Sequence, residues 1–152
     1  MSLAKDIGTA LSNLLGTITA ANGYHTDIGA RVFRGRLAID ESRIPCIILA
    51  ELDDLNKDAV SQGTSISVDQ RYTMEFHIVC DPDNPNDAAH DAIEDLKKAL
   101  FHNVARVGTA FSKDVRKLAY VGKTIAPRPD GSPVVAGSIT VVASFHEDLR
   151  NP

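Results

Sequence analysis

The chain has 152 residues, which allows one compact domain, residues 1–152, and leaves little room for a second. Apolar residues make up 43% and charged residues 24%, so the chain can bury a core and a broadly disordered protein is excluded. The 16 basic and 20 acidic side chains give a formal net charge of −4, without the basic excess of a dedicated nucleic-acid binder.

An apolar stripe at helical period opens the chain. Its members recur at i, i+4, i+7, i+8 and i+11, and they are Ile7, Leu11, Leu14, Leu15 and Ile18. Ser2 can serve as an N-cap, and Asn22-Gly23 supplies a C-terminal stop. We therefore predict a helix from about Leu3 to Ala20.

Three strands are predicted next. The segment from Arg31 to Leu37 is mixed and is typical of a short strand. Residues 44–52 are apolar on both alternating faces, as in a strand covered on both sides, with Pro45 at its start or on an edge. Residues 66–80 alternate and predict a long strand with one wet face. Asp53 to Ser65, between these two strands, lose the apolar pattern and predict a long polar loop.

A second helix is opened by the turn cluster 81–86, with acidic residues in its first half and lysines later, as the macrodipole favours. Its apolar positions are Ile93, Leu96, Leu100 and Val104. Two more strands, 118–126 and 134–145, are joined by Pro- and Gly-rich turn residues and predict a hairpin. The order α-β-β-β-α-β-β predicts an α+β fold, a mixed and mainly antiparallel sheet of about five strands with two helices packed on one face.

Features that would indicate a membrane protein, a secreted protein or a redox site are missing. The longest apolar run, Ile44 to Ala50, has a strand's length, so no bilayer span is predicted. The N-terminus does not resemble a signal peptide, and we expect a cytoplasmic protein. Cys46 and Cys80 lie in apolar runs without CxxC spacing, which predicts buried thiols.

No motif calls for catalysis. Gly122-Lys123-Thr124 resembles the end of a phosphate-binding loop, but Lys117 occupies the position of the first glycine and the triplet lies in a strand pattern. The 5 histidines are scattered, and neither HExxH nor GxSxG occurs. We therefore expect no enzyme and no catalytic, cofactor or metal site.

Charge is distributed unevenly along the chain. Residues 40–95 hold 14 acidic and 3 basic side chains, whereas residues 96–128 hold 8 basic and 1 acidic. Such blocks can form complementary surfaces on two copies of the chain, and a head-to-tail interface that closes by rotation makes a ring. Alternatively, the two blocks neutralise each other within one molecule. The sequence leaves both open.

The segment Asn22-Gly23-Tyr24-His25-Thr26-Asp27-Ile28-Gly29-Ala30-Arg31-Val32-Phe33-Arg34-Gly35-Arg36 is followed by Ile44-Pro45 and its apolar strand, the polar loop, the long strand and the Asp/Asn/Pro-capped helix. This succession resembles small prophage proteins of the tail terminator or minor tail type. The element order over almost the whole chain is similar to that of the tail terminator of long-tailed phages. The resemblance implies a structural protein that forms a hexameric ring, caps the finished tail tube, stops its growth and prepares head attachment.

The resemblance also implies partners and a location. The partners would be other copies of the chain, the tail tube protein and a head-tail connector, with neither specific nucleic-acid binding nor a membrane. The location would be the host bacterial cytoplasm during assembly and then the virion tail. An acidic lumen would let DNA pass by like-charge repulsion.

Two sets of residues are candidates for the subunit or tube interface. The polar loop from Asp53 to Ser65 is expected to order on contact with a neighbour or the tube, and its candidates are Asp53, Asp54, Lys57 and Asp58. Arg34 and Arg36, predicted to lie two apart on one strand face, are candidates to meet acidic groups of the next subunit. The alternative for both sets is an ordinary solvated loop and strand face.

Two other functions compete with the ring-forming protein. A head-tail neck or completion adaptor would have similar partners at another position. A small cytoplasmic hydrolase would use a histidine and a carboxylate, and it predicts a concave pocket that gathers at least two histidines or a carboxylate pair. Ring assembly predicts oligomers that depend on protein concentration.

Overall fold

The computed structural model describes residues 2–36, 39–56, 63–102 and 112–152. Within these ranges there are two α-helices, α1 (Leu3–Leu15) and α2 (Pro85–Phe101). The strands are β1 (Val32–Arg34), β2 (Cys46–Asn56), β3 (Ser65–Val79), β4 (Val115–Ile125) and β5 (Val134–Asp148). Three single 3-10 turns lie at Ala20–Asn22, Ile28–Ala30 and Glu41–Arg43.

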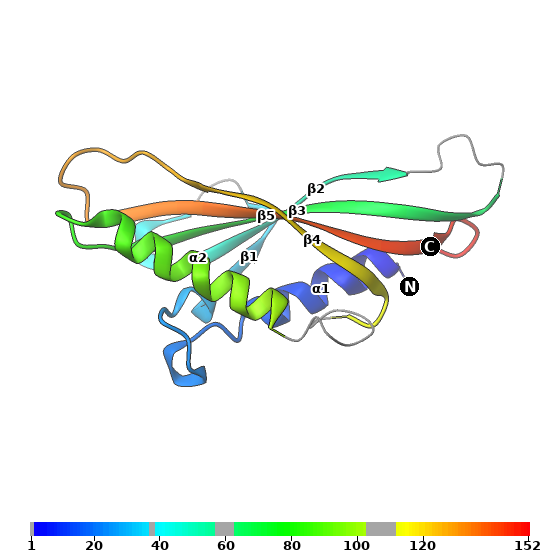
Figure 1. The fold of residues 1–152 in the computed structure, drawn as a ribbon, viewed down its shortest axis with the longest axis horizontal. Coiled ribbons are helices and arrows are strands. Elements are labelled where there is room, and N and C mark those ends of the chain that lie inside the picture. Colours follow the sequence, from blue (N-terminus) through cyan, green and yellow to red (C-terminus); the bar gives the residue numbers. More distant parts are fainter. Residues whose placement is uncertain (1, 37–38, 57–62, 103–111) are drawn as a thin grey trace.

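The strands form one sheet in the order β1-β2-β3-β5-β4. Only the pair β1 and β2 is parallel, and the other three pairs are antiparallel. Both helices lie on the same side of the sheet, below the strands in Figure 1. The predicted α+β fold, with a mixed, mainly antiparallel sheet and two helices on one face, is confirmed.

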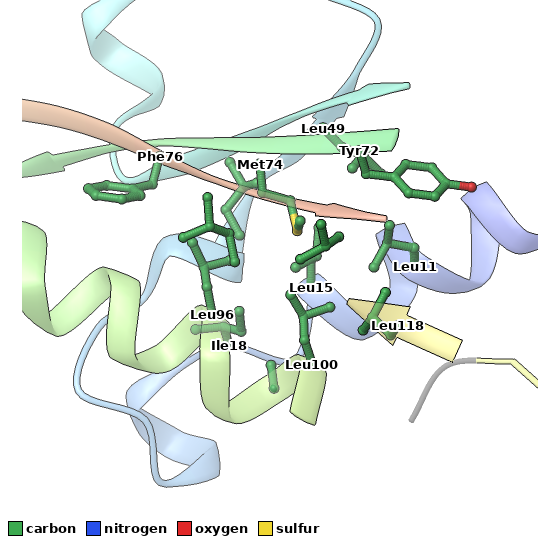
Figure 2. Close-up of a cluster of buried hydrophobic side chains, with 14 of the residues drawn as sticks. Leu11, Leu15, Ile18, Leu49, Tyr72, Met74, Phe76, Leu96, Leu100 and Leu118 are labelled. Carbon is green, nitrogen blue, oxygen red and sulfur yellow. The ribbon is translucent and has the colours of Figure 1, made fainter. Parts of the chain in front are cut away.

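The core fills the space between the helices and one face of the sheet. Because side chains alternate along a strand, every second residue of β3 and β5 points toward the helices and is buried. Figure 2 shows side chains from both helices and the sheet meeting there, among them Leu11, Leu15, Ile18, Leu49, Tyr72, Met74, Phe76, Leu96, Leu100 and Leu118.

Helix α1 begins as predicted and ends earlier. The Ser2 hydroxyl accepts a hydrogen bond from the Lys5 N–H at 3.4 Å. The helix ends at Leu15 and not at Ala20, because Thr17 uses its hydroxyl to donate to the carbonyl of the last turn, which favours a turn over another helical residue. Ile18 still belongs to the core, since the chain folds back at this point.

Helix α2 holds the turn before β1 in place. Asp95 is completely buried, and its carboxylate accepts hydrogen bonds from the N–H of His25 at 3.0 Å and of Thr26 at 2.8 Å. The Thr26 hydroxyl donates to the same carboxylate at 2.7 Å. Residues 25 and 26 are therefore fixed on the middle of α2. Val104, predicted to extend the helix stripe, lies outside the described residues.

The second face of β2 is covered at its start, as its apolar sequence predicted, but not at Leu52, which is 46% exposed. Cys46 and Ile48 are buried although their register partners on β3, His77 and Glu75, belong to the face away from the helices. Ile39 and Ile44 line a hollow on this side of the sheet together with His77.

Strand boundaries differ from the prediction in β1, β2, β4 and β5, the last of which runs to Asp148 and not to residue 145. The first strand, expected over 31–37, spans only Val32–Arg34. β2 runs to Asn56, so the predicted start of a loop at Asp53 is wrong, because backbone pairing with β3 does not require apolar side chains. β4 begins at Val115 and pairs with β5 in the predicted hairpin.

Candidate functional site

Within the residues that the structure describes, the sheet has two open edges. β1 pairs only with Ile47, Ile48 and Leu49, so that among the described residues no strand flanks β2 from Ala50 onward. β4 is the last strand on the other side. The unpaired backbone groups of an open edge are available to another chain unless the edge is protected.

The open part of β2 is acidic. We call Glu51, Leu52, Asp53 and Asp54 the acidic edge, and all four are exposed. A bulge lies between Glu51 and Asp54, and the Gln70 side-chain amide supports it by donating to the Leu52 carbonyl at 2.8 Å. Leu52 is 46% exposed. The structure thus brings the predicted interface residues Asp53 and Asp54 together, on a strand end and not in a loop.

The open edge of β4 is basic. We call Arg116, Lys117, Tyr120, Val121 and Lys123 the basic edge, and all five are exposed. A bulge lies between Tyr120 and Gly122, and the intervening Val121 is 56% exposed. The sequence predicts that residues 96–128 are basic, but it does not predict which of them form this edge. The signal available was an apolar residue, Val121, between basic side chains of a strand.

Arg34 and Arg36 do not lie on one strand face, which corrects the prediction. Arg34 is paired with Glu51 and donates to the Thr9 hydroxyl of α1 at 3.2 Å, so it lies on the helix side of the sheet. Arg36 follows Gly35, whose positive φ of 69° turns the chain. The Arg36 guanidinium stacks 4.7 Å from the ring centre of Phe33, and it borders a hollow on the opposite side.

The remaining interface candidates divide into two groups. Lys57 and Asp58 lie outside the described residues. Asp53 and Asp54 are paired with no cation in the part of the chain that the structure describes, whereas Glu51 is neutralised by Arg34. The acidic edge thus keeps two uncompensated carboxylates.

The acidic edge and the basic edge are separated by β3 and β5. This separation determines whether their charges neutralise each other within one molecule. Three strand spacings put β2 and β4 roughly 14 Å apart at their nearest. This exceeds the Debye length of about 10 Å at 0.1 M salt. The charges of the two edges therefore do not neutralise each other. A partner meets negative charge at the acidic edge and positive charge at the basic edge.

A hollow of about 420 Å³ lies on the sheet face away from the helices. Its polar lining includes Glu41, Glu75, His77 and Arg128. His77 Nε2 lies 3.6 Å from a Glu75 carboxylate oxygen and is buried without a hydrogen-bond partner. One histidine and two carboxylates thus share this hollow, while His25 lies elsewhere, 3.7 Å from Glu94. Across the described ranges no three His, Cys, Asp or Glu side chains are placed to hold a metal ion.

Other residues that the sequence singled out have structural roles. Cys46 and Cys80 are free and buried, as predicted. Burial raises the pKa of the Cys46 thiol to about 11, which keeps it neutral and weakly nucleophilic. Gly122-Lys123-Thr124 lies within β4, as the strand pattern predicted.

Comparison with known proteins assigns no role to either edge. No described helix has the length and apolar character that crossing a membrane requires. No protein-family model matches the chain, and no curated protein matches it.

Proposed function

We propose that this protein is a structural component of a phage or prophage tail, which assembles into a ring that caps the tail tube, terminates tail growth and prepares head attachment. The observation that carries the proposal is the presence of an acidic and a basic open edge on opposite sides of one sheet. A contact between two unlike surfaces joins copies head to tail, and it makes a closed ring when the rotation closes. The resemblance of the sequence to tail terminator proteins supports the same role.

Opposite charge gives such an assembly its direction. Two acidic edges repel each other, as do two basic edges. The acidic edge of each copy therefore contacts the basic edge of one neighbour, and its basic edge contacts the acidic edge of another. A ring built in this way has two different faces, one for the tail tube and one for the head or a connector. The partners are therefore further copies of the chain, the tail tube protein and a head-tail connector. Assembly would take place in the host bacterial cytoplasm.

Light scattering after size exclusion tests the proposal over a range of protein concentrations, at low and high salt, with and without tail tube. We expect a discrete ring-sized species, or a monomer that converts to one when tube is added. The assembly should weaken at high salt because the charges of the edges are screened. A monomer under all these conditions would contradict the proposal.

A neck or completion adaptor would use the same edges at another position in the virion. It differs in its partner, since it would bind the connector and leave the tube free. Pull-down of the purified protein on isolated tubes and on isolated connectors distinguishes the two positions.

A small hydrolase is the second candidate, favoured by the hollow that gathers Glu41, Glu75 and His77. In such an enzyme His77 would act as the base and Glu75, 3.6 Å away, would orient it. Hydrolysis of a panel of ester and phosphoester substrates by the native protein, abolished in Glu75→Gln, would favour this candidate.

A further inference from the structure

We propose that the acidic edge of one copy docks on the basic edge of a second copy, with Leu52 against Tyr120 and Val121 and with Asp53 and Asp54 facing the lysines of β4. This inference rests on the proposed function and specifies the surfaces through which the copies meet. Three observations carry it, namely the exposed apolar side chains, the two bulges and the uncompensated charges.

Each edge exposes an apolar side chain at its bulge. Leu52 is 46% exposed on β2, and Val121 is 56% exposed on β4 beside the 41% exposed Tyr120. Both edges carry charged side chains and a bulge, which protect a sheet edge against backbone pairing, but a large exposed apolar side chain does not serve that purpose. An apolar centre with a polar rim around it is instead the arrangement of a protein–protein interface, in which the surrounding contacts exclude water from the centre.

The bulges determine how the edges can meet. Each bulge, Glu51/Asp54 on β2 and Tyr120/Gly122 on β4, breaks the regular spacing of backbone groups. A ladder of hydrogen bonds therefore cannot continue across the middle of the interface. The contact is made by side chains around the bulges, where the apolar residues are exposed.

The charges next to the apolar residues are opposite in sign on the two edges. Asp53 and Asp54 directly follow Leu52. Lys117 and Lys123 lie on either side of Val121 on β4, and no described carboxylate is paired with either lysine. Lys97 already stacks on Tyr120, 4.9 Å from the ring centre. Among the described residues, the acidic edge thus carries two free carboxylates beside Leu52, and the basic edge carries the free side chains of Arg116, Lys117 and Lys123, whose long flexible stems can reach them.

A charge swap tests the docking under conditions in which the native protein assembles. The variant Asp53→Lys/Asp54→Lys has two basic edges, and the variant Lys117→Glu/Lys123→Glu has two acidic edges. Each alone should assemble at least about tenfold more weakly, because like charges now face each other. An equimolar mixture should regain assembly with the two variants alternating, which can be measured by light scattering and native mass spectrometry.

Matched controls separate docking from net charge and from folding. The variant Asp91→Lys/Asp130→Lys changes the net charge by the same amount as Asp53→Lys/Asp54→Lys, at exposed positions outside both edges, and should assemble like the native protein. Variants that had failed to fold could not rescue each other on mixing. Leu52→Ser and Val121→Ser provide a second test at exposed positions, and each should weaken assembly without lowering thermal stability.

The outcomes distinguish this docking from the proposed function. The docking would be overturned if both charge-swapped variants formed rings as readily as the native protein, or if the two folded variants did not assemble when mixed. Either result would leave the proposed ring function standing. A native protein that never assembles, even on tail tube, would overturn both.

Discussion

Asp95 of α2 accepts both hydrogen bonds that Thr26 can donate, from its backbone N–H at 2.8 Å and from its hydroxyl at 2.7 Å. This link fixes the turn that leads into β1 on the helix layer. Since β1 then contributes only Val32–Arg34 to the sheet, β2 is left unpaired from Ala50 onward. The acidic edge is open because β1, which this turn leads into, ends at Arg34, where Gly35 with its positive φ of 69° turns the chain.

Replacing Asp95 by alanine should lower the free energy of unfolding by about 2–3 kcal/mol, because two buried donors of Thr26 and the partly buried N–H of His25 lose their acceptor. Asp91→Ala, an exposed position on the same helix, should cost less than about 0.5 kcal/mol. Urea denaturation of the two variants checks the difference. Equal costs would show that the Asp95 hydrogen bonds contribute nothing beyond helix propensity.

Much of the fold could be predicted because its signals are local. The alternation of apolar and polar residues in β3 and β5 identified the strands and the face that each buries. The stripe through Leu11 identified the buried face of α1, and the turn residues 127–133 identified the hairpin. These patterns depend on neighbours in sequence and require no knowledge of the tertiary structure.

The features that define the candidate site could not be predicted, because they depend on contacts between distant residues. Asp95 had the pattern of a solvated acid, and its donors lie at residues 25 and 26. β2 continues through Asp53 because β3 pairs with it, although its sequence there is polar. The open edges follow from the strand order, which one sequence does not contain.

Two buried glycines should differ in how strongly alanine destabilises the fold. A Cβ on Gly29 would lie 2.7 Å from the carbonyl oxygen and 2.8 Å from the nitrogen of Ile18, so the backbone must shift, at a cost of about 1–3 kcal/mol. A Cβ on Gly8 would meet only the side-chain ends of Glu51 and Arg34, which can move.

For Gly8→Ala, the gain in helix propensity of about 0.5–1 kcal/mol offsets the loss of a partly exposed ion pair, worth about 0.2–1 kcal/mol. We therefore expect little change in the melting temperature for Gly8→Ala and a clear decrease for Gly29→Ala. Similar decreases in both variants would show that the contact with the ion pair is as rigid as the contact with the backbone.

Stability should fall at alkaline pH through Cys46. Burial raises the pKa of its thiol from 9.0 to about 11 in the folded state. Above pH 9 the unfolded chain releases this proton while the folded chain keeps it, so the free energy of unfolding decreases by up to about 1.4 kcal/mol per pH unit until pH 11. Tyr72, whose pKa burial raises to about 12, adds a similar decrease above pH 10.

Cys46→Ala isolates the contribution of the thiol. Its free energy of unfolding should be lower at pH 8 because of the lost side chain, but nearly independent of pH between 9 and 10. Urea denaturation at half-unit steps of pH gives both slopes. A variant as steep as the native protein between pH 9 and 10 would place the titrating group elsewhere.

Arg34→Gln tests how the acidic edge is tuned. The change removes the cation paired with Glu51 and adds one uncompensated carboxylate to the edge, while the loss of an exposed pair costs less than about 1 kcal/mol of stability. If the acidic edge docks on a basic edge, Arg34→Gln should assemble more strongly at low salt and with a steeper salt dependence. Arg36→Gln, on the other face of the sheet, should leave assembly unchanged. Weaker assembly of Arg34→Gln would instead show that Arg34 itself contacts an acidic group of the neighbour, and concentration series at two salt concentrations decide between the two.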